Sequence, residues 1–333
     1  MLRSLFGSNR PVVLAFLVLP AAIAAVAALF FSEGTAPVLA GPAFDLLFGY
    51  VHRIPALSVA LGAAVILAGA VLVNSVYNVH EYADRENYMP AAVYVLFGIS
   101  SPEWLYFNPV FTANIFLLLA LRRLLRIYRI SNAASMLYDA GLFTALAVLF
   151  YPPAAACVPF LWVGMNRLRS ATLREWFIPL LGLGTPVVYA LAAYWWFEMT
   201  PDFEEFSDLG GRFRFGPDAE TPHSRLFFLF LGITLAAVLI GSVRFLSGMG
   251  VSTVHRKNTK AVFVWFSIFL VFTFVYTGFL PENDVAAVAS LAAPTAVFAS
   301  FSFNTDKARR WSGLLLYFWT ALVVLRFLYA GIL

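Results

Sequence analysis

Long apolar runs separated by short polar stretches dominate the chain. A helix that spans a membrane needs about 20 mostly apolar residues. Seven runs reach or approach that length: Pro11–Phe31, Ile54–Tyr77, Trp176–Phe197, Leu226–Phe245, Ala261–Leu280, Val285–Phe301 and Trp311–Leu333. Four shorter runs lie among them: Met89–Ile99, Pro109–Leu125, Ser135–Phe150 and Ala154–Met165. The pattern predicts an all-α fold, a polytopic transmembrane helical bundle of about eleven segments.

Two of the shorter runs limit how such a bundle can be built. As helices, Met89–Ile99 and Ala154–Met165 would reach only about 17–20 Å, so they must stay upright, stop part-way or be shielded by protein. The stretch Ser135–Met165 is too long for one typical span, and proline cannot continue a helix interior. Pro152-Pro153 therefore predicts a tight hairpin in this stretch.

Composition places the chain in a membrane. Hydrophobic residues make up 61% of the 333 residues and charged residues only 12%. Soluble proteins contain about 45–50% apolar and about 25% charged residues, so these few charges could not cover a water-exposed surface. The net charge of +4 is small, and we expect no nucleic-acid partner. The single Cys157 excludes an intrachain disulfide.

Basic residues fall in alternate loops. With the N-terminus in the cytoplasm, 17 of the 22 Lys and Arg residues lie in loops that would face the cytoplasm. Cytoplasmic loops are enriched in Lys and Arg, and one segment more or fewer would invert every later loop. The distribution therefore predicts an N-in/C-out topology. The longest polar loops, Ser32–Arg53 and Glu198–Arg225, would then lie on the outer face, where we expect functional residues.

Two outer carboxylates are candidate catalytic residues. Glu33 directly follows the first apolar run, and Asp45 lies in the mostly apolar stretch Gly41–Tyr50, which could run along the membrane surface. A partly desolvated carboxylate there would have a raised pKa and could act as a general base on a substrate hydroxyl. The alternative for each residue, which the sequence favours, is a solvated interfacial acid that has no catalytic role.

Three outer arginines are candidate ligands for a lipid phosphate: Arg53, Arg225 and Arg326. Arg326 lies about 22 Å into the last apolar run. A charge inside a span is costly and by default indicates a partner or a function, and phosphate is a natural partner for a forked guanidinium. The alternative is that Arg326 extends to the outer headgroups.

Other chemistry has little support. No two of the four histidines are spaced for a zinc site, and the sequence has neither a glycine-rich phosphate loop nor a nucleophile elbow. We therefore expect no metal and no cofactor. Asp139 lies near the cytoplasmic end of the run Ser135–Phe150, where it would cap a helix or pair with an arginine. The apolar runs have no carboxylate near their centres, which disfavours an ion-coupled carrier.

The region Pro109–Trp196 carries a family resemblance. It contains the run Asn114–Leu125 with Arg122-Arg123, then Asp139–Pro153, then Arg174-Glu175-Trp176. This order resembles a family of uncharacterised bacterial multi-pass inner-membrane proteins, over most of the chain. The resemblance implies a single integral membrane domain over residues 1–333 in the bacterial cytoplasmic (inner) membrane.

The order of parts is also similar to the membrane module of GT-C glycosyltransferases, which use polyprenyl-phosphate-linked sugars. Ser32–Arg53 matches their first outer loop, Met89–Leu125 a hairpin that ends in cytoplasmic arginines, and Tyr151-Pro152-Pro153 an outer turn. The similarity covers approximately residues 1–200, with additional helices over 224–333. It implies that Glu33 or Asp45 is the catalytic acid and that Arg326 holds the lipid phosphate.

Three functions follow as hypotheses. The first is a glycosyltransferase-like enzyme that acts on a polyprenyl-phosphate-linked substrate at the outer face. The second is a non-catalytic membrane subunit or scaffold of an envelope assembly, with membrane-protein partners. The third is a lipid or small-solute transporter. A cavity that joins an outer acid to an arginine would favour the enzyme, whereas a midplane cavity would favour a carrier.

Overall fold

The computed structural model describes residues 12–31, 40–83, 86–130, 132–198, 222–249, 253–280, 286–303 and 309–330. Every regular element in these ranges is helical, which confirms the all-α prediction. Four helices are long and apolar enough to cross a membrane: Pro55–Val79, Leu173–Trp196, Arg225–Ser247 and Val254–Gly278. The protein therefore has the helices of a membrane protein.

The helices follow the apolar runs of the sequence. In chain order they are α2 (Val12–Phe31), α3 (Pro42–Phe48), η1 (Val51–Arg53), α4 (Pro55–Val79), α5 (Met89–Gly98), η2 (Pro102–Leu105), α6 (Pro109–Leu125), α7 (Ala134–Phe150), η3 (Pro152–Cys157), α8 (Phe160–Leu168), α9 (Leu173–Trp196), α11 (Pro222–Ser247), α12 (Val254–Gly278), α13 (Ala286–Ala289), α14 (Ala292–Phe303) and α15 (Arg309–Ala330).

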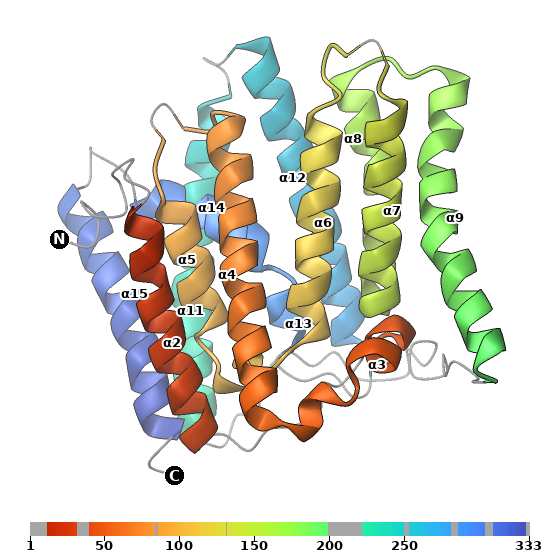
Figure 1. Ribbon diagram of the computed structural model, residues 1–333. Helices are drawn as coiled ribbons and strands as arrows, with labels where there is room; N and C mark the ends of the chain where they lie inside the picture. The colour runs from red at the N-terminus through yellow and green to blue at the C-terminus, as the bar shows by residue number, and fades with distance from the viewer. Residues whose placement is uncertain are drawn as a thin grey trace.

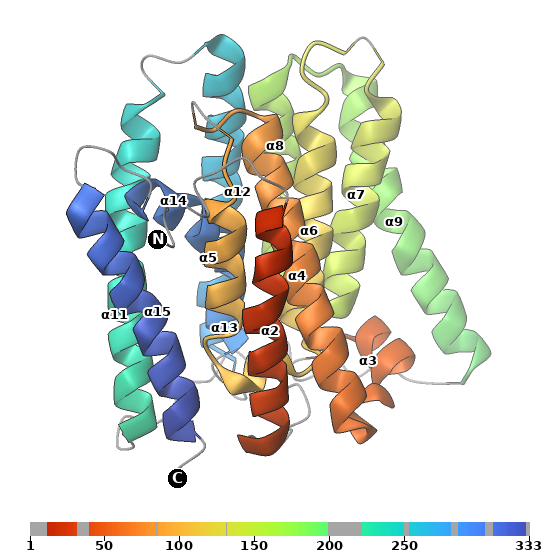
Figure 2. The same ribbon diagram turned by 60° about the vertical axis from the view of Figure 1, so that its left-hand side comes forward.

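The long helices stand side by side and alternate in direction (Figure 1). The connections α4–α5, α6–α7, α8–α9 and α11–α12 turn at the upper end of the bundle in this view. The short helix α3 and the C-terminus lie at the lower end, and Figure 2 shows the same arrangement from a second direction. The bundle thus has two distinct ends, which carry different side chains.

The short helices α5 and α14 form the centre of the bundle. Nearly all their side chains are buried, and the two helices contact each other. The long helices α4 and α11 cover them, α4 against α5 and α11 against α14. Neighbouring helices therefore shield the short apolar run at residues 89–99 from lipid, which is one of the options predicted for so short a segment.

Small residues allow a close helix contact between α7 and α9. A Cβ atom at Gly141 would collide with the backbone carbonyl of Pro179, and one at Gly182 with that of Tyr138. Glycine at both positions lets the two backbones touch, as is common between membrane helices. The far end of α9 leaves the bundle (Figure 1), and Trp195 there is 81% exposed.

Two predicted runs are divided in the structure. The hairpin prediction at Pro152-Pro153 is confirmed, because α7 ends at Phe150 and α8 begins at Phe160. The prediction of a single helix over Ala154–Met165 is wrong. The segment Pro152–Cys157 between α7 and α8 forms a 3-10 helix, because prolines lack the N–H donors that an α-helix needs. Val285–Phe301 is likewise not continuous: it breaks into α13 and α14, with Pro294 in the first turn of α14.

Candidate functional site

Arg326 is the main feature of the lower end of the bundle. It lies in the last turns of α15, and its side chain is 0% exposed. Its guanidinium carbon lies 4.9 Å from the ring centre of Phe227 and 5.8 Å from that of Phe230, both on α11. The side chain therefore points between helices. The alternative that it extends to the headgroups at the surface is wrong, because the rings of α11 enclose it.

The guanidinium of Arg326 is poorly hydrogen-bonded. Its Nη2 donates to the Oγ of Ser101 at 3.4 Å, which is long for such a bond. Its Nε and Nη1 have no hydrogen-bond partner among the described residues. Burial of a charge with few partners costs roughly several kcal/mol, so an anion bound beside the guanidinium would stabilise this arrangement.

The turn that faces Arg326 adds more unused donors. It consists of Ser100, Ser101 and the 3-10 helix η2. The Ser100 hydroxyl and the Trp104 indole nitrogen are also buried without a partner. Of nine such atoms in the described part of the chain, four belong to Ser100, Trp104 and Arg326. Unsatisfied buried polar groups are rare in native proteins, and their concentration here indicates a binding site.

Aromatic rings hold this site in place. Trp319 of α15 stacks on Phe230 with ring centres 5.5 Å apart. Phe97 lies 6.2 Å from Phe230 and 5.3 Å from Trp104. The rings therefore connect the helix that carries Arg326 to the turn that carries Trp104. Because large rings have few rotatable bonds, the donors are held in fixed positions.

The chemistry of these groups favours an oxyanion ligand. Guanidinium and indole N–H groups donate only, and hydroxyls can donate as well. Phosphate oxygens accept several such bonds at once, and Arg binds them with two parallel N–H groups. The carboxylate of Glu103 interacts electrostatically with Arg326 but is exposed, so solvent weakens its attraction.

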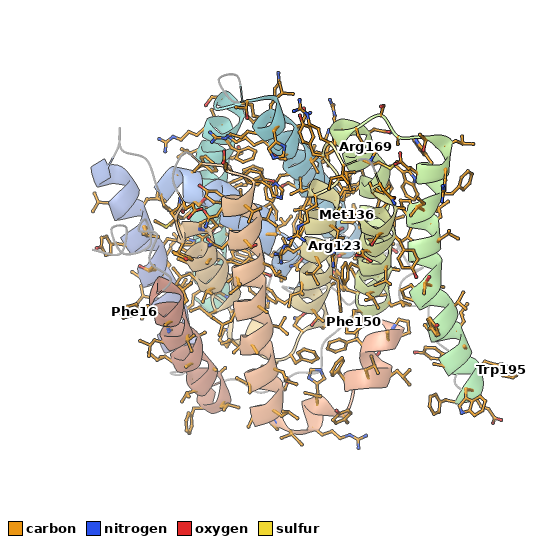
Figure 3. The ribbon with its side chains drawn as sticks, turned by 45° about the horizontal axis from the view of Figure 1, so that its top comes forward. Phe16, Arg123, Met136, Phe150, Arg169 and Trp195 are labelled. Atoms are coloured by element: carbon orange, nitrogen blue, oxygen red, sulfur yellow. The ribbon has the colours of Figure 1, made fainter. Side chains whose placement is uncertain are left out.

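Asp45 lies in a separate part of the lower end. It is an exposed residue of α3, which is attached to α7 through a hydrogen bond from the Gly41 amide to the Phe150 carbonyl at 2.9 Å. The Tyr194 hydroxyl of α9 donates to the Pro42 carbonyl at 2.9 Å. Partial desolvation raises the pKa of the Asp45 carboxyl, as predicted for a residue at this surface. Figure 3 shows Phe150 beside α3.

The structure does not bring Asp45 and Arg326 together. Figures 1 and 2 place α3 and α15 on opposite sides of the bundle, with α2 and α4 between them. Glu33, the other predicted acid, lies outside the described residues. The described residues therefore do not assemble the predicted pair of a base and a phosphate ligand.

The other two predicted arginines are at the surface. Arg53 ends the 3-10 helix η1, and Arg225 lies in the first turns of α11; both are exposed. The sequence analysis missed Ser100, Ser101 and Trp104. The one signal that could have found them is a short polar turn between two apolar runs, Ser100–Glu103, which contains both serines and directly precedes Trp104.

The upper end of the bundle carries most of the basic residues of the described chain, at the helix ends and loops where α6 meets α7, α8 meets α9 and α11 meets α12 (Figure 3). Several of them form ion pairs: Arg123 with Asp139 at 3.3 Å, Arg169 with Glu175 at 2.9 Å and Arg256 with Glu81 at 3.0 Å. Of the two expectations for Asp139, pairing with an arginine is therefore confirmed. Capping is wrong, because α7 begins a full turn earlier, at Ala134.

Two apolar grooves lie on the sides of the bundle. One, of about 520 Å³, is lined by Phe272, Phe279 and their neighbours on α12, and the other, of about 260 Å³, lies between α2 and α4. Neither contains a predicted site residue. Within the described ranges, no three His, Cys, Asp or Glu side chains gather as metal ligands would. Comparisons with family models, curated proteins and solved structures gave no match to this chain.

Proposed function

We propose that the chain is a multi-pass inner-membrane protein that binds the phosphate group of a lipid-linked compound at its outer end, through Arg326. A polyprenyl phosphate is the ligand class that fits best, since it combines a phosphate with a long apolar chain. The observation that carries the proposal is the guanidinium of Arg326, which is fully buried and has two nitrogens without partners.

The topology in this proposal is eleven segments, N-in and C-out. Two observations support it. The helices alternate in direction along the chain, and the loops rich in arginine and lysine gather at the upper end of the bundle. Since such loops stay in the cytoplasm, the end that carries Arg326 would face the outside.

Sugar transfer is not part of the proposal as it stands. A transferase needs a base within hydrogen-bonding reach of the acceptor hydroxyl while the lipid phosphate is bound. Asp45 lies across the bundle from Arg326, so it does not fill that role in this arrangement. A subunit that binds and presents a lipid phosphate to a partner fits the described residues better than a complete enzyme.

The proposal is tested with farnesyl phosphate, a short polyprenyl phosphate, and with farnesol, which has the same chain and no phosphate. Farnesyl phosphate should bind the purified protein in a neutral detergent, and farnesol should bind at least about tenfold more weakly. Loss of one charge-assisted hydrogen bond costs about 1.5–3 kcal/mol, so Arg326→Leu should weaken farnesyl phosphate binding by about 10–100-fold. Calorimetry or native mass spectrometry would measure both ligands.

Matched variants show whether the effect is local. Arg167→Leu removes an exposed arginine at the opposite end and should leave the affinity unchanged. Asp45→Asn should also have no effect, and Arg326→Lys should recover little affinity, because an ammonium cannot replace a bidentate fork. Equal binding of farnesol and farnesyl phosphate, or full binding by Arg326→Leu, would refute the proposal.

A further inference from the structure

His80 is a buried imidazole at the upper end of the bundle, far from the Arg326 site. It caps the C-terminus of α4, where its backbone N–H donates to the Val76 carbonyl at 3.3 Å. The residue is only 6% exposed, and its Nδ1 has no hydrogen-bond partner in the described structure. Its ring centre lies 6.3 Å from that of His255 and 6.4 Å from that of Tyr82. Packing therefore holds a ring here whose Nδ1 has no partner among the described residues.

Burial and basic neighbours act on this ring. Burial is the largest cause that lowers the pKa of His80 to about 4, and the electrostatic effects of His255, Arg126 and Arg122 act in the same direction. Both arginines come from the C-terminal end of α6, where Arg122 is half-buried. His255 approaches from α12, with its ring 4.6 Å from Tyr128.

The nearby carboxylates are already occupied. Glu81 pairs with Arg256 at 3.0 Å, and Asp139 pairs with Arg123 at 3.3 Å. No carboxylate in the described residues forms an ion pair with Arg122 or Arg126. The dipole at the end of α6 explains why cations are favoured there. It does not explain why a buried imidazole lies near those arginines, since no described carboxylate pairs with either arginine.

We propose that His80, Arg122 and Arg126, with His255 at the edge, form a phosphate-binding site at the cytoplasmic end of the bundle. Two guanidinium groups supply charge and parallel N–H donors, and a neutral imidazole supplies one more N–H donor. A divalent cation does not fit, because the arginines would repel it. The ligand is a phosphate group, carried either by an anionic phospholipid headgroup of the inner leaflet or by a soluble phosphate compound.

The test uses purified full-length protein in a zwitterionic detergent, with three probes. These are dioctanoyl phosphatidylglycerol, inorganic phosphate and dioctanoyl phosphatidylcholine, which is zwitterionic. Wild type should bind the anionic lipid or phosphate at least about tenfold more tightly than phosphatidylcholine. Arg122→Gln/Arg126→Gln should lose about tenfold or more of that affinity, because two charge-assisted hydrogen bonds disappear. Preference for the lipid over inorganic phosphate identifies a headgroup, and the reverse identifies a soluble ligand.

The control variant Arg167→Gln/Arg174→Gln removes the same charge from the same end of the bundle, at exposed positions. It should keep wild-type affinity. An equal loss in both double variants would mean that binding depends only on net charge, and the proposal would be wrong. Equal affinity of wild type for all three probes would also refute it.

A second measurement uses wild type alone and does not depend on how the variants fold. In protein labelled at histidine, the ring signals of His80 should shift when the preferred probe is added. The bound negative charge should raise the pKa of His80 above its ligand-free value of about 4. Probe binding that leaves the His80 signals and pKa unchanged would place the ligand elsewhere and overturn the proposal.

Discussion

Two arginines withdrawn from solvent, Arg169 at the upper end and Arg326 at the lower end, have opposite surroundings. Arg169 pairs with Glu175 at 2.9 Å and donates to the Ile130 carbonyl at 2.7 Å. Arg326 has one long bond to Ser101 and two nitrogens without partners. The first arginine joins the end of α8 to the start of α9. Arg326 instead leaves two of its N–H donors without a described partner. A buried charged side chain therefore indicates a candidate binding site only when its hydrogen-bond and ion-pair partners are missing.

Of the substitutions considered below, removal of the Arg169 side chain should lower the free energy of unfolding most. Arg169→Leu should lower the free energy of unfolding by about 2–4 kcal/mol, because it leaves the Glu175 carboxylate and the Ile130 carbonyl without their donor. Unfolding in a mixed detergent with a denaturing component would measure this loss. The exposed Arg167→Leu should change stability by less than about 0.5 kcal/mol. A similar result for both variants would mean that the pair at α9 does not stabilise the junction.

Acid should destabilise the protein through His80, a buried neutral imidazole whose Nδ1 has no partner among the described residues. The pKa of His80 is lowered from 6.5 to about 4, so between these values the unfolded chain binds more protons than the folded one. Stability is therefore fully present above about pH 6.5 and falls as the pH drops toward 4. One residue shifted this far would cost about 2 kcal/mol at pH 5.

His80→Gln separates this effect from other titrations. The variant should lose less stability than wild type between pH 7 and pH 5, measured in the absence of phosphate. Addition of an anion that binds beside His80 should also reduce the loss in wild type, because it favours the protonated ring. If wild type and His80→Gln respond identically to pH, the imidazole is not held in its neutral form as the structure indicates.

The smallest expected change in stability is that of Arg326→Leu, and its sign best distinguishes Arg326 from Arg169. Replacement of a buried ionic group by an apolar one of similar size is often neutral or stabilising. Arg326→Leu should therefore raise the unfolding free energy of the ligand-free protein by about 1 kcal/mol, the opposite sign to Arg169→Leu. A thermal unfolding experiment without added lipid would show it. A strong loss of stability would mean that Arg326 has a structural role.

Much of the fold could be predicted from the sequence. The apolar runs marked the helices because a membrane segment must satisfy its backbone hydrogen bonds internally, as a helix does. Pro152 and Pro153 marked the end of α7, since proline removes a donor and blocks the preceding turn. The short runs at residues 89–99 and 154–165 were correctly expected to differ from full-length helices, as α5 and α8 do.

The candidate sites depend on tertiary structure. Arg326 and Ser101 are 225 positions apart, and His80 and His255 come from α4 and α12. The helices that carry them are apolar on all sides, so no periodic pattern shows which face turns inward. The chain alone therefore determined that an arginine lies within an apolar helical segment. Only the packing of α15 against α11 and the Ser100–Leu105 turn decided that this arginine is enclosed with unused donors, because enclosure depends on neighbours from distant segments.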